Sequence, residues 1–200
     1  MSDYLALRRR ARIIRDSGGY DIHLGESNPV IFEDFVERLF DRDLLPTIWE
    51  PFAGHTGPSK NCDLCEDVDI ELIAYDIAPC DARVKQADST LHGPQKAIGG
   101  LFFHPPYFGT NPMSGNHSDL SIQSDLHMYR NALSCTAGFA AVSLVKDGIS
   151  CLVCRDYRTA GRRIRLDKIF LELFEGLRFS LIDVWTSEPD IVLVMKRDER

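Results

Sequence analysis

The sequence predicts one α/β domain with a mostly parallel sheet that carries helices on both faces. Short apolar segments of strand-like composition alternate with segments of helical periodicity, which is the pattern of such a sheet. Of the 200 residues, 44% are hydrophobic and 26% are charged, which is enough apolar material for one buried core. Neither a repeat nor a second set of elements is found, so we expect a single domain over residues 1–200.

Seven strands are expected, each ended by glycine, proline or a polar turn. In chain order they are residues 47–50, 70–75, 84–88, 99–103, 149–154, 179–185 and 191–196. The last two are separated by residues 187–190, Ser-Glu-Pro-Asp, a polar turn that predicts an antiparallel closing pair.

Helices are expected between these strands and before the first one. Residues 1–27 are expected to form a basic amphipathic helix, which stops at residues 17–19, and a connector. Asn28 and Pro29 open a second helix, in which apolar residues recur at helical spacing up to Phe40. Two further helices are expected at about residues 123–142 and 165–176.

The composition indicates a cytoplasmic protein without a membrane partner. The N-terminal segment is basic and amphipathic and lacks the apolar core of a signal peptide. The sequence has no run of eighteen apolar residues that could cross a bilayer. Six cysteines in a chain with this much apolar material do not require disulfides, which favours a reducing compartment.

The formal net charge of −7 is unevenly distributed, so it does not exclude a nucleic-acid partner. Five arginines and one lysine lie between Arg155 and Lys168. Guanidinium groups match phosphate oxygens, so this stretch is expected to contact a nucleic-acid strand. A solvated loop is the alternative.

A glycine-containing turn follows the first expected strand. Residues 50–57 read Glu-Pro-Phe-Ala-Gly-His-Thr-Gly, and glycine lets the backbone turn sharply and approach a ligand closely. A tight turn without a ligand is the alternative. A phosphate-binding loop is disfavoured because the lysine–hydroxyl pair that follows its second glycine is missing.

Acidic residues end the next two strands, at the sheet edge where open α/β folds bind ligands. Asp76 lies about twenty residues beyond the turn, where a carboxylate suits the paired hydroxyls of a ribose. Asp88 could accept from an adenine amino group. The alternatives are a helix N-cap or a solvated acid for Asp76, and a helix cap formed by Ser89 and Thr90.

The fourth expected strand is followed by His104, Pro105, Pro106 and Tyr107. The prolines fix the backbone and cannot donate, so their carbonyls are expected to accept from a ligand. Tyr107 offers a ring on which a base can stack, an interaction worth about 1–3 kcal/mol. The alternatives are a simple strand terminator and a core tyrosine.

In this order, these features resemble the S-adenosylmethionine-dependent DNA methyltransferases that modify N6 of adenine or N4 of cytosine. The shared pattern is an Asn-Pro helix, a Glu-Pro-Phe-Ala-Gly turn, an acid after the next strand and X-Pro-Pro-Tyr after the fourth. The pattern covers about residues 28–196 and implies a Rossmann-like class I methyltransferase fold with a seven-stranded sheet. The chain departs from it at His104, where the family has Asp, Asn or Ser, and at Thr56, where the family has glycine.

The resemblance also implies the residues of each site. S-adenosylmethionine would be bound by Asn28, Pro29, Glu50, Pro51, Phe52, Ala53, Gly54, Asp76, Asp88 and His104. Catalysis would involve His104, Pro105, Pro106 and Tyr107. DNA would be contacted by Phe108, Asp119, Ser121, Arg155, Arg158, Arg162 and Arg163.

Methyl transfer to an aromatic amine requires that its nitrogen be held near the methyl donor and become tetrahedral. We expect the Pro105 carbonyl and the His104 ring to accept the two amino hydrogens. Tyr107 would stack on a base that has been flipped out of the duplex. Only a neutral histidine can accept, so we expect activity to fail as His104 is protonated.

Two other functions stay open. One is a methyltransferase fold that has lost catalysis and acts as a partner subunit, which His104 and the negative net charge favour. The other is methylation of RNA or of a protein amide. No stretch remains for a separate target-recognition domain, so the sequence choice of a restriction–modification enzyme would come from residues 55–68 and 108–121, or from a second subunit, either a homodimer copy or a separate specificity subunit.

No metal site is expected. Cys62 and Cys65 have the spacing of a zinc knuckle, as do Cys151 and Cys154. The second pair lies in an expected strand, where residues three apart point to opposite faces. One remaining pair is too few ligands, unless other residues complete a site at Cys62 and Cys65.

Overall fold

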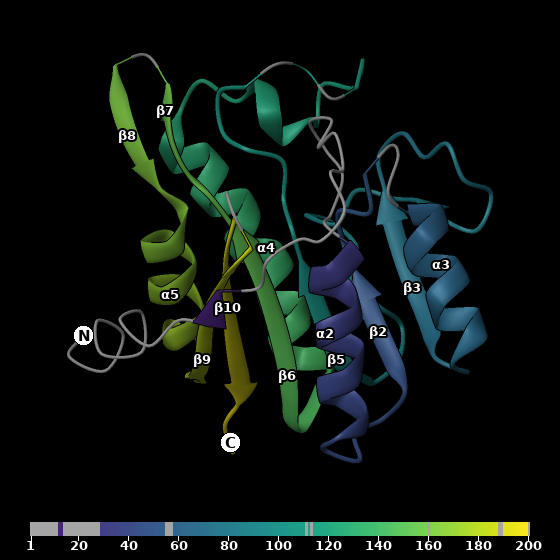
Figure 1. Cartoon of the computed structure of the whole chain (residues 1–200). Coiled ribbons are helices and arrows are strands. Elements are labelled where there is room, and N and C mark those ends of the chain that lie inside the picture. The colour runs from purple at the N-terminus through teal and green to yellow at the C-terminus, as the bar shows by residue number, and fades with distance from the viewer. Residues whose placement is uncertain are drawn as a thin grey trace.

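The computed structural model describes residues 12–13, 29–54, 58–110, 112, 114–159, 161–187 and 190–199. In this part of the chain, eight strands form one sheet in the order β1-β9-β10-β6-β5-β2-β3-β4 (Figure 1). The strands are β1 (Arg12–Ile13), β2 (Thr47–Glu50), β3 (Glu71–Asp76), β4 (Lys85–Gln86), β5 (Ile98–Phe103), β6 (Leu144–Cys154), β9 (Phe179–Ser187) and β10 (Asp190–Arg197). Only β10 runs antiparallel to its neighbours, so the sheet is mostly parallel as predicted.

The seven predicted strands are confirmed; β5, β9 and β10 are one or two residues longer than predicted, and two strands differ by more. The fifth, β6, begins at Leu144 instead of 149, and the third, β4, is only two residues long. The predicted N-terminal helix is wrong at Arg12 and Ile13, which form β1 and pair parallel with β9. Pairing with an open sheet edge overrides the helical periodicity of these residues. The rest of residues 1–27 lies outside the described residues.

Helices cover both faces of the sheet, as predicted (Figure 1). They are α2 (Pro29–Phe40), α3 (Pro58–Asp67), α4 (Leu126–Ser143) and α5 (Leu166–Gly176), with a short 3-10 helix, η1 (Leu120–Ile122). Strand residues alternate between the two layers: Phe102 packs with α2, whereas Phe103 packs with α4 and α5. No helix in the described part of the chain combines the length and apolarity that a membrane crossing requires.

The two cysteines of β6 lie on opposite faces of the sheet, as the strand prediction required. Cys151 is buried in the layer that contains α2, and Cys154 is buried in the layer that contains α4 and α5. A metal ion therefore cannot be held by both. Among the described residues, no group of three or more His, Cys, Asp or Glu side chains is placed to hold one.

The chain reverses direction across the sheet between β2 and β5, which defines where a ligand fits. From β2 it passes outward to β3 and β4, and then returns to β5 on the other side of β2. Loops that leave neighbouring parallel strands in opposite directions open a crevice at their carboxyl ends. The turns after β2, β3, β4 and β5 therefore meet at one edge of the sheet.

Two glycines at the start of β5 allow the connection into β2 and helix α2 to pack closely on the sheet. A Cβ atom at Gly99 would lie 2.0 Å from the backbone carbonyl oxygen of Leu45. A Cβ atom at Gly100 would lie 2.8 Å from the ring of Phe35 in α2. The first contact involves backbone, so it cannot be relieved by a change of side-chain rotamer.

We predict that Gly99→Ala lowers the free energy of unfolding by at least about 3 kcal/mol, at the upper end of overpacking costs. The matched control is Gly138→Ala in α4, where a Cβ meets no atom within 4 Å. Alanine in a helix interior is favoured over glycine by up to about 1 kcal/mol, so this control should gain stability. Urea unfolding measures both changes, and equal stability of Gly99→Ala and the unchanged protein would contradict the packing argument.

Candidate active site

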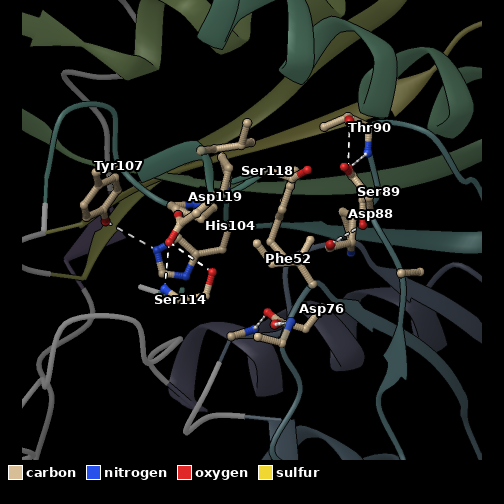
Figure 2. A pocket seen from close by; sticks show the side chains of 18 of the residues that line it. Phe52, Asp76, Asp88, Ser89, Thr90, His104, Tyr107, Ser114, Ser118 and Asp119 are labelled. Atoms are coloured by element: carbon tan, nitrogen blue, oxygen red, sulfur yellow. Dashed lines mark hydrogen bonds between the residues drawn. The ribbon is translucent and has the colours of Figure 1, made fainter. Parts of the chain in front are cut away.

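One continuous cleft joins the carboxyl ends of the parallel strands (Figure 2). The space inside it and at its open mouth is about 1090 Å³ in total. It is lined by Pro51, Phe52, Gly54, Asp76, Ile77, Ala78, Ala87, Asp88, Ser89, Thr90, His104, Pro105, Pro106, Tyr107, Ser114, Ser118, Asp119, Leu120 and Arg155. The glycine turn and the Pro-Pro-Tyr corner, which lie far apart in the sequence, thus share one cavity.

The turn after β2 is fastened to the end of β3 by Asp76. Its carboxylate accepts from the Gly54 N–H at 3.0 Å and from the Ala78 N–H at 2.7 Å. Gly54 has a φ of +75°, a left-handed conformation that favours glycine. Ala53, also buried, donates its N–H to the carbonyl of Tyr75 at 3.0 Å. The Asp76 carboxylate therefore faces the cleft with its position fixed by two backbone donors.

Asp88 faces the same cleft from the segment after β4. Its Oδ1 atom accepts from the Thr90 N–H at 2.9 Å and from the Thr90 hydroxyl at 2.7 Å. No described residue donates a hydrogen bond to Oδ2. The neighbouring Ser89 hydroxyl donates to the carbonyl of Pro51, which ties this segment to the glycine turn. Residues 89–91 form a turn and no helix follows, so a helix cap at Ser89 and Thr90 is wrong.

Helix α4 fixes the Pro-Pro-Tyr corner. The hydroxyl of Tyr129 donates to the Pro106 carbonyl at 2.8 Å, so this carbonyl already has one partner, and only its second lone pair can serve a ligand. The Pro105 carbonyl accepts no hydrogen bond from a described residue, and Pro105 lines the cleft. The Pro105 carbonyl oxygen can therefore accept from a ligand in the cleft, as predicted from the sequence.

Tyr107 belongs to a buried polar cluster that the sequence did not reveal. Its hydroxyl lies 3.3 Å from His104 Nε2 and donates to Asp190 Oδ1 at 3.2 Å. Arg155 donates to the same Asp190 oxygen, with Nε at 3.0 Å and Nη2 at 2.9 Å. The Arg155 guanidinium also lies over the Tyr107 ring, 5.5 Å from its centroid. Arg155 thus fixes the tyrosine ring and neutralises Asp190 rather than pointing into solvent.

Burial sets the protonation of this cluster. Loss of hydration lowers the pKa of His104 below its usual 6.5; Asp190 opposes the shift and Arg155 adds to it. The ring is therefore neutral at pH 7, and the loss of activity expected on its protonation falls below pH 6.5. Burial, and then the charge of Asp190, raises the pKa of Tyr107, so its hydroxyl keeps its proton.

Glu50 ends β2 without lining the cleft. It is 1% exposed, and its Oε1 atom accepts from the Asn61 amide of α3 at 3.0 Å. Its Oε2 atom has no hydrogen-bond partner among the described residues. Burial raises the pKa of this carboxyl to about 8, with a smaller contribution from Asp76, against the lowering effect of Asn61. Glu50 is therefore a mostly protonated acid at neutral pH.

The loop after Tyr107 divides between the core and the cleft. Phe108 is 8% exposed and packs on Tyr129, with 5.5 Å between ring centroids, so it does not line the cleft. Asp119 does line it, and its carboxylate accepts from the Ser114 N–H at 2.7 Å and from the Ser121 hydroxyl at 2.6 Å. Ser121 itself is fully buried. Asp119 therefore organises this loop, with Ser114 and Ser118 on the cleft wall.

The arginine-rich stretch forms a hairpin instead of the loop considered for it. Strands β7 (Asp156–Thr159) and β8 (Arg162–Arg165) pair antiparallel and project at the carboxyl end of the sheet (Figure 1). Arg163 pairs with Asp156 at 2.7 Å. Arg158 is exposed, lies opposite Arg163 in the register, and forms no ion pair with a described residue.

One of the two predicted cofactor residues before β2 lies at the start of α2. Pro29 is the first residue of that helix, and Asn28 lies outside the described residues. Of the predicted set, the cleft brings together Pro51, Phe52, Gly54, Asp76, Asp88, the corner residues 104–107, Asp119 and Arg155. Among the described side chains, it does not include Glu50, Ala53, Phe108, Ser121, Arg158 or Arg163, and the side chain of Arg162 lies outside the description. Asp190, Tyr129 and Asn61 were not predicted, because each acts through a long-range contact.

Comparison with known proteins finds no match among protein-family models or curated proteins. Solved structures do match. The 1,6-didemethyltoxoflavin-N1-methyltransferase of Burkholderia thailandensis, with bound S-adenosylhomocysteine, has a TM-score of 0.57 at 12% identity, over 99% of this chain and 87% of that chain. The fold is that of the S-adenosylmethionine-dependent methyltransferases.

Two further structures support this fold. The N-methyltransferase NodS of Bradyrhizobium japonicum has a TM-score of 0.55 at 12% identity, over 86% of this chain and 99% of that chain. An S-adenosylmethionine-dependent methyltransferase of Clostridium acetobutylicum has a TM-score of 0.54 at 8% identity, over 86% of this chain and 93% of that chain. The predicted Rossmann-like class I methyltransferase fold is confirmed.

We predict that Glu50→Gln stabilises the protein in a pH-dependent way. Folding favours the protonated form of Glu50, because its pKa is about 8 in the folded protein and about 4.5 ordinarily. The unchanged protein therefore loses stability as pH rises from about 4.5 to about 8. The variant cannot ionise, so its advantage in free energy of unfolding should grow by up to about 1.4 kcal/mol per pH unit over this window. Urea unfolding at pH 5, 6.5 and 8 measures it.

The matched control for this prediction is Glu37→Gln, a change at an exposed glutamate of α2. A stability difference between Glu50→Gln and the unchanged protein that stays constant from pH 5 to pH 8 would contradict a raised pKa at Glu50.

Proposed function

We propose that this chain is an S-adenosylmethionine-dependent methyltransferase that modifies the exocyclic amino group of a base, N6 of adenine or N4 of cytosine, in DNA. The observation that carries the proposal is the single cleft that contains both the glycine turn and the Pro-Pro-Tyr corner. The methyltransferase fold supports the cofactor, and the corner's acceptors support an amine substrate.

The chemistry of the cleft fits S-adenosylmethionine. Gly54 lets a ligand approach the backbone, Asp76 offers carboxylate oxygens suited to ribose hydroxyls, and Asp88 Oδ2 suits an amino donor. Phe52 contributes apolar surface next to this turn, and it packs edge-on against Phe103 with 5.4 Å between ring centroids. These residues would hold the cofactor, with Asn28 and Pro29 proposed to close its methionine side.

When bound, the cofactor supplies a methyl group on a sulfonium sulfur, which keeps the bonding electron pair as the amine lone pair forms the new N–C bond. His104 and the Pro105 carbonyl would accept the two amino hydrogens and draw the nitrogen toward tetrahedral geometry. Tyr107 would hold the flipped base by stacking. The neutral ring of His104 would take the proton that the methylated, cationic amine gives up.

The β7–β8 hairpin is the proposed contact with the nucleic-acid backbone. Arg158 and Arg163 lie opposite each other in the register, and Asp156 compensates the charge of Arg163 but not that of Arg158. A phosphate oxygen beside the hairpin would accept from Arg158 and, in addition to Asp156, from Arg163. Arg162, in the same strand as Arg163, would extend the contact.

A second candidate is methylation of an amino group on a small heteroaromatic molecule. It is favoured by ion pairing at this end of the sheet, where Arg155 binds Asp190, Arg163 binds Asp156, and Arg165 binds Asp167 at 2.6 Å. With these charges compensated and a net charge of −7, long-range attraction for a polyanion is weak.

The deciding experiment incubates the purified protein with methyl-labelled S-adenosylmethionine and, separately, duplex DNA, single-stranded DNA, RNA and free nucleosides. The proposal expects label in N6-methyladenine or N4-methylcytosine after digestion of the DNA. His104→Ala should lower the rate at least about 100-fold, the usual contribution of a positioned acid–base group. If only RNA or only free nucleosides are labelled, DNA is not the substrate and the labelled molecule is. Cofactor binding without any transfer would indicate a non-catalytic partner subunit.

We predict that Arg158→Ala/Arg163→Ala weakens DNA binding and its salt dependence. Removing two phosphate contacts should reduce the slope of log affinity against log salt by about 1–2. The control is Lys96→Ala/Lys146→Ala, which removes the same charge at the amino ends of β5 and β6. Fluorescence anisotropy with a labelled duplex measures both slopes. Equal slopes for the two double variants would contradict the proposed contact between the hairpin and DNA.

A further inference from the structure

A buried carboxylate reaches the Pro-Pro-Tyr corner from the last strand of the chain. Asp190 is the first residue of β10, is 4% exposed, and lies 83 residues beyond Tyr107. It does not line the cleft, whereas Tyr107 and His104 do. Asp190 can therefore influence a substrate only through its neighbours, either through Tyr107 and then His104, or through Arg155, which also lines the cleft.

The three groups form a short chain of polar contacts. Asp190 Oδ1 lies 3.2 Å from the Tyr107 hydroxyl oxygen, and this oxygen lies 3.3 Å from His104 Nε2. The tyrosine hydroxyl has one proton and accepting lone pairs, a carboxylate only accepts, and a neutral imidazole has one N–H and one acceptor. The number of available protons therefore limits which of these three groups donates and which accepts.

One arrangement makes both contacts hydrogen bonds. The Tyr107 hydroxyl donates to Asp190, and His104 donates from Nε2–H to the Tyr107 oxygen. In the reverse arrangement Tyr107 donates to His104, and its oxygen then faces the anionic Asp190 oxygen with lone pairs on both sides. A hydrogen bond to a charged acceptor is stronger than one to a neutral acceptor, so the first arrangement is favoured.

We propose that Asp190 is a positioning residue that fixes the tautomer of His104, with the proton on Nε2 and the acceptor lone pair on Nδ1. The role of that lone pair as acceptor for a substrate amine rests on the proposed function. Asp190 acts through Tyr107 and has no contact with substrate in this proposal.

The surrounding groups support the arrangement. Tyr107 retains its proton because burial raises its pKa, and His104 is neutral because burial lowers its pKa. Arg155 balances the charge of Asp190 and holds the Tyr107 ring from one face, 5.5 Å from the centroid. The tyrosine therefore keeps its hydroxyl proton, and its ring cannot rotate away without losing the hydrogen bond to Asp190 and the contact with Arg155.

The test uses nuclear magnetic resonance of the full chain with ¹⁵N-labelled histidine, without cofactor or substrate. The signals of His104 are identified by their loss in His104→Asn. We expect His104 to be protonated at Nε2, with its N–H exchanging slowly with water. In Asp190→Asn, the acceptor of the Tyr107 hydroxyl loses its charge, so this exchange should become at least about tenfold faster.

Tyr107→Phe tests the same chain from the other side. It removes the hydroxyl, keeps the ring and leaves the Asp190–Arg155 pair intact, so it remains informative if Asp190→Asn does not fold. It should also accelerate exchange at His104. The control is Asp183→Asn, which removes a carboxylate paired with Arg38 at 2.9 Å on β9, and it should leave His104 unchanged. Protonation of His104 at Nδ1, or unchanged exchange in Tyr107→Phe, would overturn the proposal.

Kinetics then separate this proposal from the proposed function. If the chain transfers methyl groups, Asp190→Asn should lower kcat at least about tenfold, with little change in the Kd of S-adenosylmethionine. The expected tautomer in a protein without methyl transfer would overturn the proposed function and leave the Asp190–Tyr107–His104 chain standing. Methyl transfer with an unchanged kcat in Asp190→Asn would overturn the role of Asp190 in catalysis.

Discussion

The carboxylate of Asp76 is the contact on which the cleft depends. It joins the Gly54 N–H after β2 to the end of β3, 22 residues away, and accepts a second N–H from Ala78. A backbone donor left without an acceptor in a buried turn is costly, and a charged acceptor binds it more tightly than a neutral one. Together with the Ala53 N–H, which donates to the Tyr75 carbonyl, this side chain fixes the left-handed turn at Gly54 relative to the neighbouring strand. The position of this part of the cleft thus depends largely on one acid at the end of β3.

The sheet was predictable because its signals are local. Apolar runs ended by glycine, proline or polar turns marked all seven main strands, and their alternation reflects the two faces, as at Phe102 and Phe103. Strand β1 and the β7–β8 hairpin were not predictable in this way. Arg12 and Ile13 are extended because an edge of β9 is open to them, and the hairpin residues are mostly polar and pair with each other. Their sequences carry no apolar alternation that would indicate a strand.

The residues of the site likewise divide into those that the sequence could place and those that it could not. Strand ends in an open α/β sheet converge by topology, so Phe52, Asp76 and the corner at residues 104–107 could be placed at one edge from order alone. Tyr129 and Asp190 could not, because they contact the corner from 23 and 83 residues away and their sequence surroundings are those of an ordinary helix and strand. Phe108 was wrongly expected at the site for the opposite reason. It directly follows the motif in the sequence, but its ring packs on Tyr129 of α4 in the core.

Charge balance decides what kind of acceptor the corner can be. Asp190 brings a negative charge within two hydrogen bonds of His104, but Arg155 lies on the same carboxylate oxygen and cancels most of it. His104 is itself neutral, so the corner offers two neutral acceptors, its ring and the Pro105 carbonyl. Under the proposed function, this environment orients a neutral amine without strongly attracting cations. Once His104 has taken the proton, the product would be a neutral methylated amine, and the protonated ring could no longer accept a hydrogen bond from it, which favours release after transfer.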